Sequence, residues 1–262
     1  MVRKTKIAFV DIDWTIYDHS NGGHVFDYES IEALNKLRKL GTKVVICTAR
    51  PYHSVKQTGL FNYIEVDGMI LSNGALVIAD NEIVYQNEIN PKKVIKIADL
   101  VMQNEVNLEI IEPFTSYIVK DIDQNVINLY GTYYEEDPPV KDYHNPHALA
   151  LMLFAPESYD EMFISNMPKG ISYFRFHPFG VDLVEKIQSK GAAIKKMLRH
   201  YKIAKKDSVS FGDDLQDIAM FQTTGISYCM LNGKDDAKAA ASEVIPHVSE
   251  HGVKQTLEKY YL

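Results

Sequence analysis

The 262-residue sequence has few cysteines, no excess of positive charge and no long apolar run. Its two cysteines, Cys47 and Cys229, each lie inside an apolar segment typical of a buried strand, which favours small core residues over a disulfide or a metal pair. The net charge of -7 argues against a general attraction to nucleic acid or to an anionic membrane. The first apolar run stops at Asp11, too early for a signal peptide or a membrane helix, so we expect a protein of the reducing cytoplasm.

Strand-like and helical segments alternate at both ends of the chain. This rhythm predicts an α/β fold with a Rossmann-like parallel sheet as its core. The strands are expected at 6–10, 43–47, 69–72, 208–211 and 226–230. Residues 83–184 instead mix a hairpin, helices and strands, which predicts an inserted α+β cap domain. The core would then consist of residues 1–82 and 185–262.

Two helices of the predicted core have clear start signals. Asp27 can cap a helix that ends before Gly41, and Ser189 can cap a second helix. Inside the predicted insertion, residues 130–146 are rich in Tyr, Pro and acidic residues and predict a loop. We interpret the tyrosines of this region as packing and loop residues; they are Tyr130, Tyr133, Tyr134 and Tyr143.

Polar residues follow each predicted core strand at the point where the strand ends. Because ligands of open α/β sheets bind beyond the carboxyl ends of the strands, we expect these side chains to converge. They are Asp11 and Asp13, then Thr48, then Asn73, then Asp213 and Asp217, with Lys190 at the start of the helix that follows the insertion.

This group of residues has a chemical logic. Crowded carboxylates repel one another, and oxygen ligands favour magnesium, which typically takes one or two carboxylates together with a substrate phosphate. Asp11 and Asp213 can supply those carboxylates. An aspartate can attack phosphorus, and Asp13 can then protonate the leaving oxygen and later activate water. Thr48 and Lys190 can bind the phosphoryl group.

The order of these motifs resembles a known family. A DxDxT segment (11–15), a strand ending in Thr48, Lys190 and GDDxxD (212–217) together are similar to the haloacid dehalogenase-like phosphatases. The size and position of the insertion look like the large cap of the Cof-type subfamily. The segments SNGA (72–75) and EHGV (250–253) are similar to that subfamily as well.

The resemblance implies a role for each site residue. Asp11 would be the nucleophile and a magnesium ligand, Asp13 the general acid and base with its backbone carbonyl on the metal, and Asp213 the second carboxylate ligand. Asp217 would hold a metal-bound water or Lys190. Thr48 and Lys190 would bind the phosphoryl group, and Asn73 would lie near the substrate.

Two positions depart from the family pattern. Trp14 stands where the family usually has glycine, and Gln216 where it usually has asparagine. Neither usual residue is a nucleophile or a carboxylate ligand, so the expected chemistry is unaffected. Trp14 can narrow the entrance to the site or stack against the cap. Arg50 is interpreted as a surface or hinge residue in preference to a phosphate ligand.

We therefore expect a Mg²⁺-dependent phosphatase that hydrolyses small phosphate monoesters, such as sugar phosphates or phosphorylated cofactors, through an aspartyl-phosphate on Asp11. A phosphomutase or phosphotransferase with the same intermediate is the first alternative. A non-catalytic binding protein on the same fold is the second. The chain has no GxxxxGK[ST] loop, so nucleotide-dependent kinase chemistry is not expected.

Overall fold

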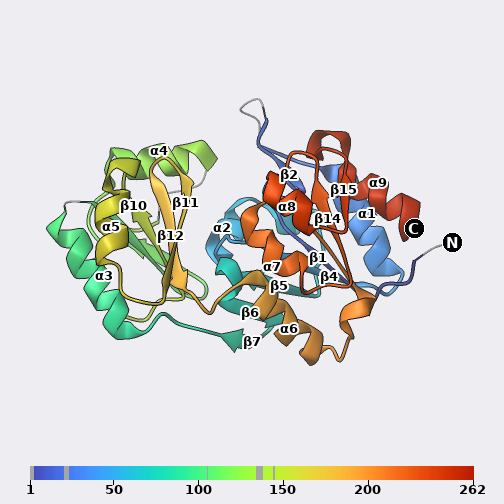
Figure 1. Ribbon diagram of the computed structural model, residues 1–262, viewed down its shortest axis with the longest axis horizontal. Coiled ribbons are helices and arrows are strands. Elements are labelled where there is room, and N and C mark those ends of the chain that lie inside the picture. The colour runs from blue at the N-terminus through green and yellow to red at the C-terminus, as the bar shows by residue number, and fades with distance from the viewer. Residues whose placement is uncertain (1–2, 21–23, 105, 134–137, 144) are drawn as a thin grey trace. The chain divides into compact units, whose positions relative to one another are not determined.

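The computed structural model describes the whole chain except residues 1–2, 21–23, 105, 134–137 and 144. The chain forms two compact units (Figure 1). Unit 1 consists of Met1–Arg50, Gly59–Tyr85 and Ser189–Leu262, and unit 2 of Pro51–Thr58 and Gln86–Gln188. Most of the expected insertion lies in unit 2. That unit starts and ends a few residues later than the sequence indicated, and it also contains Pro51–Thr58.

Unit 1 is built on a sheet that has eight strands within the described residues, in the order β15-β14-β13-β1-β4-β5-β6-β7. The strands are β1 (Ile7–Val10), β4 (Lys43–Cys47), β5 (Gly68–Leu71), β6 (Leu76–Ala79), β7 (Glu82–Gln86), β13 (Ser208–Gly212), β14 (Ile226–Met230) and β15 (Glu243–Ile245). The pairs from β15 through β5 are parallel, and β6 pairs antiparallel with β5. The predicted α/β fold with a predominantly parallel sheet is confirmed.

The strand order places β1 between β4 and β13. From β1 the chain builds the sheet outward through β4 and β5, and it later returns to build the other half through β13, β14 and β15. A sheet of this kind binds ligands where the strand order reverses, beyond the carboxyl ends of the strands. The residues that follow β1, β4 and β13 are therefore the ones to inspect for chemistry.

The helices of unit 1 begin where the sequence indicated. Asp27 caps α1 (Tyr28–Lys39) by accepting a hydrogen bond from the backbone N–H of Ser30 at 3.1 Å. Ser189 caps α6 (Lys190–His200) by accepting one from the N–H of Ala192 at 3.1 Å. The remaining helices are α7 (Ile218–Phe221), α8 (Asp235–Ala240) and α9 (Gly252–Tyr260). No described helix is long and apolar enough to cross a membrane.

The core of unit 1 forms where α6 and α7 pack on the sheet. Ile194 and Met197 of α6 lie in one buried cluster with Phe9 of β1 and with the two cysteines. Cys47 and Cys229 are both buried and unbonded, as the sequence indicated. This packing fixes the direction of α6 against the strands, and Lys190 is the first residue of that helix.

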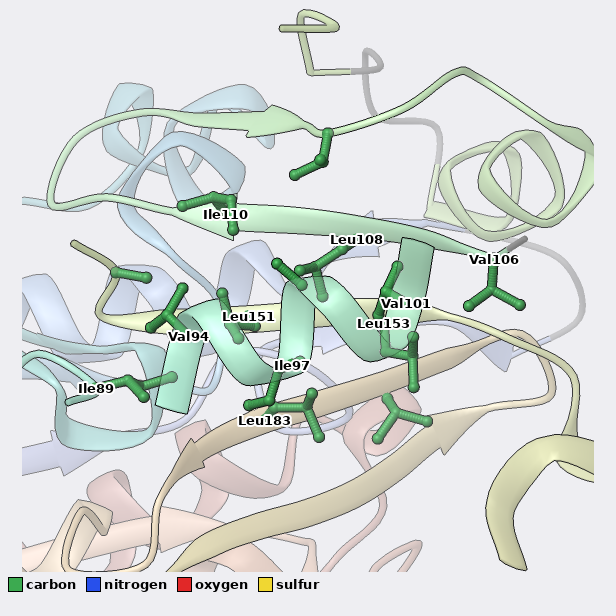
Figure 2. Close-up of a cluster of buried hydrophobic side chains, with 14 of the residues drawn as sticks. Ile89, Val94, Ile97, Val101, Val106, Leu108, Ile110, Leu151, Leu153 and Leu183 are labelled. Atoms are coloured by element: carbon green, nitrogen blue, oxygen red, sulfur yellow. The ribbon is translucent and has the colours of Figure 1, made fainter. Parts of the chain in front are cut away.

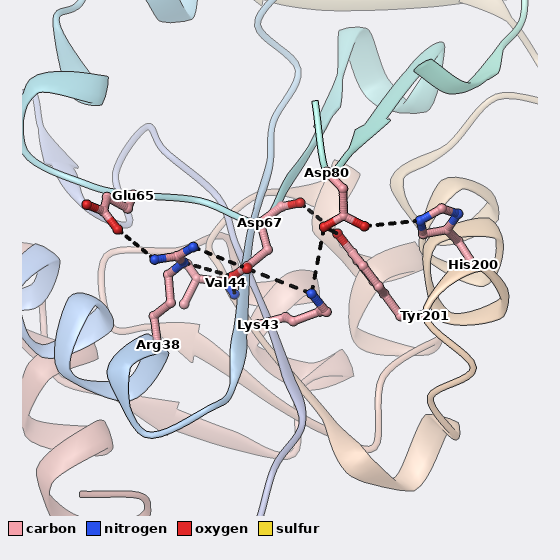
Figure 3. A network of polar contacts seen from close by, with 8 residues as sticks. All are labelled: Arg38, Lys43, Val44, Glu65, Asp67, Asp80, His200 and Tyr201. Atoms are coloured by element: carbon pink, nitrogen blue, oxygen red, sulfur yellow. Dashed lines mark hydrogen bonds and ion pairs between the residues drawn. The ribbon is translucent and has the colours of Figure 1, made fainter. Parts of the chain in front are cut away.

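A polar network fastens the amino ends of β4 and β5 to the helices around them (Figure 3). The carboxylate of Asp67, just before β5, accepts hydrogen bonds from the backbone N–H of Val44 at 2.9 Å and from Nε of Arg38 at 3.0 Å. The hydroxyl of Tyr201, just after α6, donates to the carbonyl of Asp67 at 2.6 Å and to Asp80 at 3.2 Å. These contacts hold the sheet end opposite to the carboxyl ends of its parallel strands.

Unit 2 contains an antiparallel sheet in the order β11-β12-β10-β8-β9. The strands are β8 (Asn107–Ile111), β9 (Ser116–Ile118), β10 (Ala150–Phe154), β11 (Ile171–His177) and β12 (Gly180–Glu185); the helices are α2 (Tyr52–Gln57), α3 (Pro91–Gln103), α4 (Gln124–Tyr133) and α5 (Asp160–Asn166). Figure 2 shows Val94, Ile97 and Val101 of α3 packed on apolar residues of β8, β10 and β12. The α+β composition agrees with the sequence.

Three local expectations were wrong. The first residues of the expected loop, Tyr130–Tyr133, belong to α4, because Val126, Leu129 and Tyr130 recur at helical spacing and bury against Ile118 and Phe154. The third core strand ends at Leu71, and Ser72 begins a 3-10 turn. The hairpin at Asp80 adds β6 and β7 to the sheet of unit 1, and all of it except its last residue, Gln86, belongs to that unit. Tyr134 lies outside the described residues.

Candidate active site

Three carboxylates meet beyond the carboxyl ends of β1 and β13. The side-chain oxygens of Asp11, Asp213 and Asp217 lie within 4.8 Å of one another, and all three residues are buried. Asp11 directly continues β1, and its backbone N–H donates to the carbonyl of Phe211 in β13 at 3.0 Å. Asp213 directly follows β13. Adjacent parallel strands thus bring together two residues that are 202 positions apart in the chain.

Lys190 enters this group from the start of α6. Its Nζ lies 2.9 Å from Oδ1 of Asp11 and 2.6 Å from Oδ1 of Asp217, and its side chain is 2% exposed. Burial alone would lower the pKa of Lys190, but the charges of Asp11 and Asp217 outweigh it and raise the pKa well above the usual value. The two carboxylates therefore favour the charged form of Lys190, an ammonium that lies between them.

Asp217 uses both of its oxygens to hold this arrangement. Oδ1 accepts from Lys190, and Oδ2 accepts from the backbone N–H groups of Asp213 at 2.9 Å and Asp214 at 3.1 Å. A Cβ on Gly212 would lie 2.5 Å from the Asp217 carboxylate, so this close approach requires glycine. The GDDxxD spacing is thus explained by one carboxylate that closes the loop after β13 and orients Lys190.

The carboxylates carry more negative charge than Lys190 can balance. Burial raises the pKa of Asp11 to about 8, opposed by Lys190 and assisted by the charge of Asp217. Burial and the charges of Asp217 and Asp11 likewise raise the pKa of Asp213 well above its usual value. Within the described residues, three carboxylates share one ammonium, which leaves two negative charges uncompensated when all are ionised. An all-oxygen donor set with this charge fits a small divalent cation such as Mg²⁺.

Thr48 and Asn73 lie at the same edge of the sheet. Thr48 directly follows β4 and is fully buried, and its carbonyl accepts from the backbone N–H of Asn73 at 3.3 Å. Ser72, Asn73 and Gly74 all have left-handed backbones, with φ of 48°, 55° and 94°. A Cβ on Gly74 would lie 2.5 Å from the carbonyl of Ser189, so this turn packs directly on the start of α6.

Asp13 has partners of its own. Its carboxylate accepts hydrogen bonds from Nε of Arg50 at 2.8 Å and Nη2 at 2.7 Å, and its Oδ1 lies 2.7 Å from Nε2 of His19. Burial alone would raise the pKa of Asp13, but the charge of Arg50 and the contact with His19 hold it well below its usual range. The side chain thus pairs with Arg50 and His19, and it is not a member of the Asp11, Asp213 and Asp217 cluster.

Two members of this pairing were not predicted. The expectation that Arg50 is a surface or hinge residue was wrong with respect to exposure, because Arg50 is 9% exposed and forms a bidentate ion pair. His19 was overlooked, and its Nδ1 lies 2.8 Å from Nδ1 of His24. The available signal was the polar stretch between the first strand and the first helix, which has to fold back over the strand end.

Trp14, the residue that departs from the family pattern, has a left-handed backbone with φ of 57°. The glycine usual at this position adopts that conformation without strain. Two hydrogen bonds hold the turn: the N–H of Trp14 donates to the carbonyl of Tyr17, and Asn232 donates to the carbonyl of Trp14, both at 2.8 Å. The indole is 38% exposed and lies against His19, with ring centroids 5.3 Å apart.

Comparison with known proteins matches the chain to one family along nearly its whole length. The sequence profile of the haloacid dehalogenase-like hydrolases covers residues 8–257. Phosphatase YwpJ of Bacillus subtilis is 21% identical over 287 aligned positions, which cover 97% of this chain and 99% of that protein. Phosphoglycolate phosphatase 1 of Saccharolobus solfataricus is 22% identical, with 97% and 95% covered.

Solved structures agree with this match. The subclass IIB sugar phosphatase BT4131 superposes with a TM-score of 0.84 at 25% identity, and the alignment covers 97% of this chain and 98% of that one. TM0651 from Thermotoga maritima superposes with a TM-score of 0.85 at 19% identity, covering 98% of both chains. The resemblance seen in the sequence is confirmed. The chain belongs to the haloacid dehalogenase-like hydrolases, and within that family it is a phosphoric monoester hydrolase.

Proposed function

We propose that the protein is a Mg²⁺-dependent phosphatase of small phosphate monoesters and that Asp11 is its nucleophile. The observation that carries the proposal is the buried contact of Lys190 with both Asp11 and Asp217. An ammonium beside a carboxylate attracts the phosphoryl group to that carboxylate and stabilises the charge that spreads over its oxygens during transfer. Thr48, directly after the neighbouring strand, is proposed to bind another phosphoryl oxygen.

Asp11 and Asp213 would hold the metal, together with the backbone carbonyl of Asp13. When bound, Mg²⁺ neutralises the carboxylates and the substrate phosphate, so that an anionic substrate can enter an acidic site. Asp217 already gives all of its described contacts to Lys190 and to two backbone N–H groups. We therefore assign Asp217 to positioning, although its oxygens lie close enough to belong to the cluster.

The first half of the reaction attaches the phosphoryl group to Asp11. A carboxylate oxygen of Asp11 attacks phosphorus, the ester P–O bond breaks, and the leaving oxygen takes a proton from Asp13. Arg50 and His19 favour the ionised form of Asp13 in the structure as it stands. Proton donation therefore requires the ion pair between Arg50 and Asp13 to weaken when the substrate binds.

The second half releases phosphate. The ionised form of Asp13 is the form that accepts a proton from water, and the resulting hydroxide attacks the phosphorus of the aspartyl-phosphate. The P–O bond to Asp11 breaks and the carboxylate is restored. In this step the pairing of Asp13 with Arg50 supports the reaction, because it keeps the base ionised at neutral pH.

The test is phosphate release from p-nitrophenyl phosphate and from a panel of sugar phosphates, with Mg²⁺, with EDTA, and in the Asp11→Asn variant. We expect release that needs Mg²⁺ and is lost in Asp11→Asn. Release that persists in Asp11→Asn would show that the nucleophile is a different residue. Isomerised sugar phosphate without free phosphate would identify the phosphomutase alternative instead.

A further inference from the structure

His19 places a hydrogen-bond donor against the side chain of Asp13, within unit 1. Nε2 of its ring lies 2.7 Å from Oδ1 of Asp13, and the His19 side chain is 7% exposed. An ionised carboxylate only accepts hydrogen bonds, so Nε2 carries the hydrogen and donates it. A buried donor on the proposed general acid and base is in a position to affect the reaction.

A short two-stranded sheet determines where this ring lies. Its strands, β2 (Tyr17–Asp18) and β3 (Val25–Phe26), pair antiparallel, and the next pair in the same register is His19 and His24. The Nδ1 atoms of the two rings lie 2.8 Å apart, so one of them donates and the other accepts. Because Nε2 of a neutral His19 carries the hydrogen, its Nδ1 is the acceptor. His24 thus fixes the tautomer that lets His19 donate to Asp13.

Two aromatic side chains hold the ring of His19 in place. Its centroid lies 4.7 Å from that of Tyr17 and 5.3 Å from that of Trp14. The N–H of Trp14 donates to the carbonyl of Tyr17, so both rings belong to the tight turn that directly follows Asp13. A donor held by packing loses little further freedom when it bonds a carboxylate, and it can therefore fix the direction of that carboxylate.

The two oxygens of the Asp13 carboxylate are bonded differently. Oδ1 accepts from Nη2 of Arg50 and from Nε2 of His19, both at 2.7 Å. Oδ2 accepts from Nε of Arg50 at 2.8 Å. Freeing Oδ2 for proton transfer breaks one of these hydrogen bonds, whereas freeing Oδ1 breaks two. Oδ2 is therefore the oxygen that is released more readily, and the contact of His19 with Oδ1 is kept in both protonation states of Asp13.

We propose that His19 is a positioning residue that holds Oδ1 of Asp13 while Oδ2 transfers the proton. This inference rests on the proposed phosphatase function. As the ester P–O bond breaks, its electron pair stays on the leaving oxygen, which takes the proton from Oδ2. His19 keeps its own hydrogen on Nε2 throughout, and in the second half of the reaction Oδ2 takes a proton from water. Because the ion pair with Arg50 weakens in the first half, His19 is the contact that stops the carboxyl group from rotating.

The experiment compares two amides, each of which keeps one half of the histidine. The side chain in His19→Gln is long enough to donate to Asp13 as Nε2 does, whereas the shorter one in His19→Asn places its amide near Nδ1 and keeps the contact with His24. The measurement is kcat/KM in Mg²⁺ for a hexose 6-phosphate, phenyl phosphate and p-nitrophenyl phosphate, whose leaving groups depend on a proton to a decreasing extent. His200→Phe, at an exposed position of α6, is the matched control.

The loss in His19→Asn should follow the need of the leaving group for a proton. For the hexose 6-phosphate, kcat/KM should fall about 10- to 100-fold, the effect of one hydrogen bond to a charged group. The fall should be smaller for phenyl phosphate and absent for p-nitrophenyl phosphate. His19→Gln should stay close to the wild type with all three esters, and His200→Phe should change none of them. A merely distorted site would instead slow all three esters alike.

The outcomes separate this inference from the function on which it rests. An equal fall for all three esters in His19→Asn, or no fall for the hexose 6-phosphate, overturns the inference alone. The same conclusion follows if His19→Gln loses as much activity as His19→Asn. Wild-type protein that releases no phosphate from any ester overturns both. If melting curves show that His19→Asn does not fold, His19→Phe decides the question, because it keeps an aromatic ring and removes the donor.

Discussion

Replacing Lys190 by methionine tests the central electrostatic feature of the site. The substitution keeps most of the side-chain volume and removes the ammonium that lies 2.9 Å from Asp11 and 2.6 Å from Asp217. Removing one partner of a buried ion pair leaves an uncompensated charge and destabilises a protein by about 3–5 kcal/mol. In EDTA, Lys190→Met should therefore melt roughly 6–20 °C below the wild type, since 1 kcal/mol corresponds to a few degrees in a chain of this size.

Magnesium should restore much of this loss. The variant keeps all three carboxylates of the cluster, and a cation that binds the folded state at 100 times its Kd stabilises it by about 2.7 kcal/mol. Phosphatase activity should stay absent, because the phosphoryl group loses its cationic partner. Lys195→Met, at an exposed position of the same helix, is the matched control and should change stability by less than about 0.5 kcal/mol.

Thermal melts with EDTA and across a range of Mg²⁺ concentrations measure both effects. A Lys190→Met variant as stable as the wild type in EDTA would refute the buried ion pairs as we describe them. A normal loss of stability without recovery in Mg²⁺ would refute the assignment of the carboxylate cluster as a metal site.

Three further predictions follow from the same contacts. Asp13→Asn should lower kcat for a sugar phosphate about 10²- to 10⁴-fold. With p-nitrophenyl phosphate, whose leaving group needs no proton, rapid-quench measurements should show a burst of p-nitrophenol followed by slow release of phosphate. An equal loss of rate in the burst and in the slow phase would contradict the role assigned to Asp13. In EDTA, the free energy of unfolding of the wild type should fall as pH rises from about 4 to 8, because the folded-state pKa of Asp11 is raised to about 8 and that of Asp213 is also raised. Denaturant titrations should show that this free energy depends less on pH in Asp11→Asn. A free energy of unfolding that increases over this pH range would contradict the direction of both pKa shifts. Trp14→Gly should relieve about 1 kcal/mol of left-handed backbone strain, although it also removes the contact between the indole and His19. The melting temperature should therefore stay unchanged or rise. A fall in melting temperature of more than about 10 °C would mean that the indole contact outweighs the strain.

The convergence of Asp11, Thr48 and Asp213 was predictable from the sequence. Each residue directly follows a buried strand of four or five residues, and parallel strands have their carboxyl ends on one edge of the sheet. The capping residues Asp27 and Ser189 were equally visible, because a helix start leaves a local signal in the chain.

The partners of Asp13 were not predictable in the same way. Arg50 is 37 positions from Asp13, and a single arginine after a strand end carries no sign of which way its side chain turns. The requirement for Gly212 was also hidden, since it comes from the close approach of a carboxylate five residues later.

The assignment of Pro51–Thr58 to unit 2 had no counterpart in the sequence. The helix α2 follows a core strand and looks like an ordinary crossover helix of an α/β sheet. Contacts such as Tyr52 with Phe114, whose rings lie 5.1 Å apart, and His53 with Ser116 associate it with unit 2. Such long-range contacts depend on side chains more than 60 positions apart, which periodicity and spacing do not reveal.

The central position of β1 has a consequence for synthesis on the ribosome. Ile7 pairs with Lys43 on one side and with Ser208 on the other, so one edge of β1 stays open until more than 200 residues have been made. The segment Gln86–Gln188 is contiguous and can fold within that interval. We therefore expect unit 2 to be the first stable part of the nascent chain. Until β13 emerges, one edge of β1 is a row of unpaired backbone N–H and C=O groups that can pair with another chain, and a chaperone that covers it would raise the yield of folded protein.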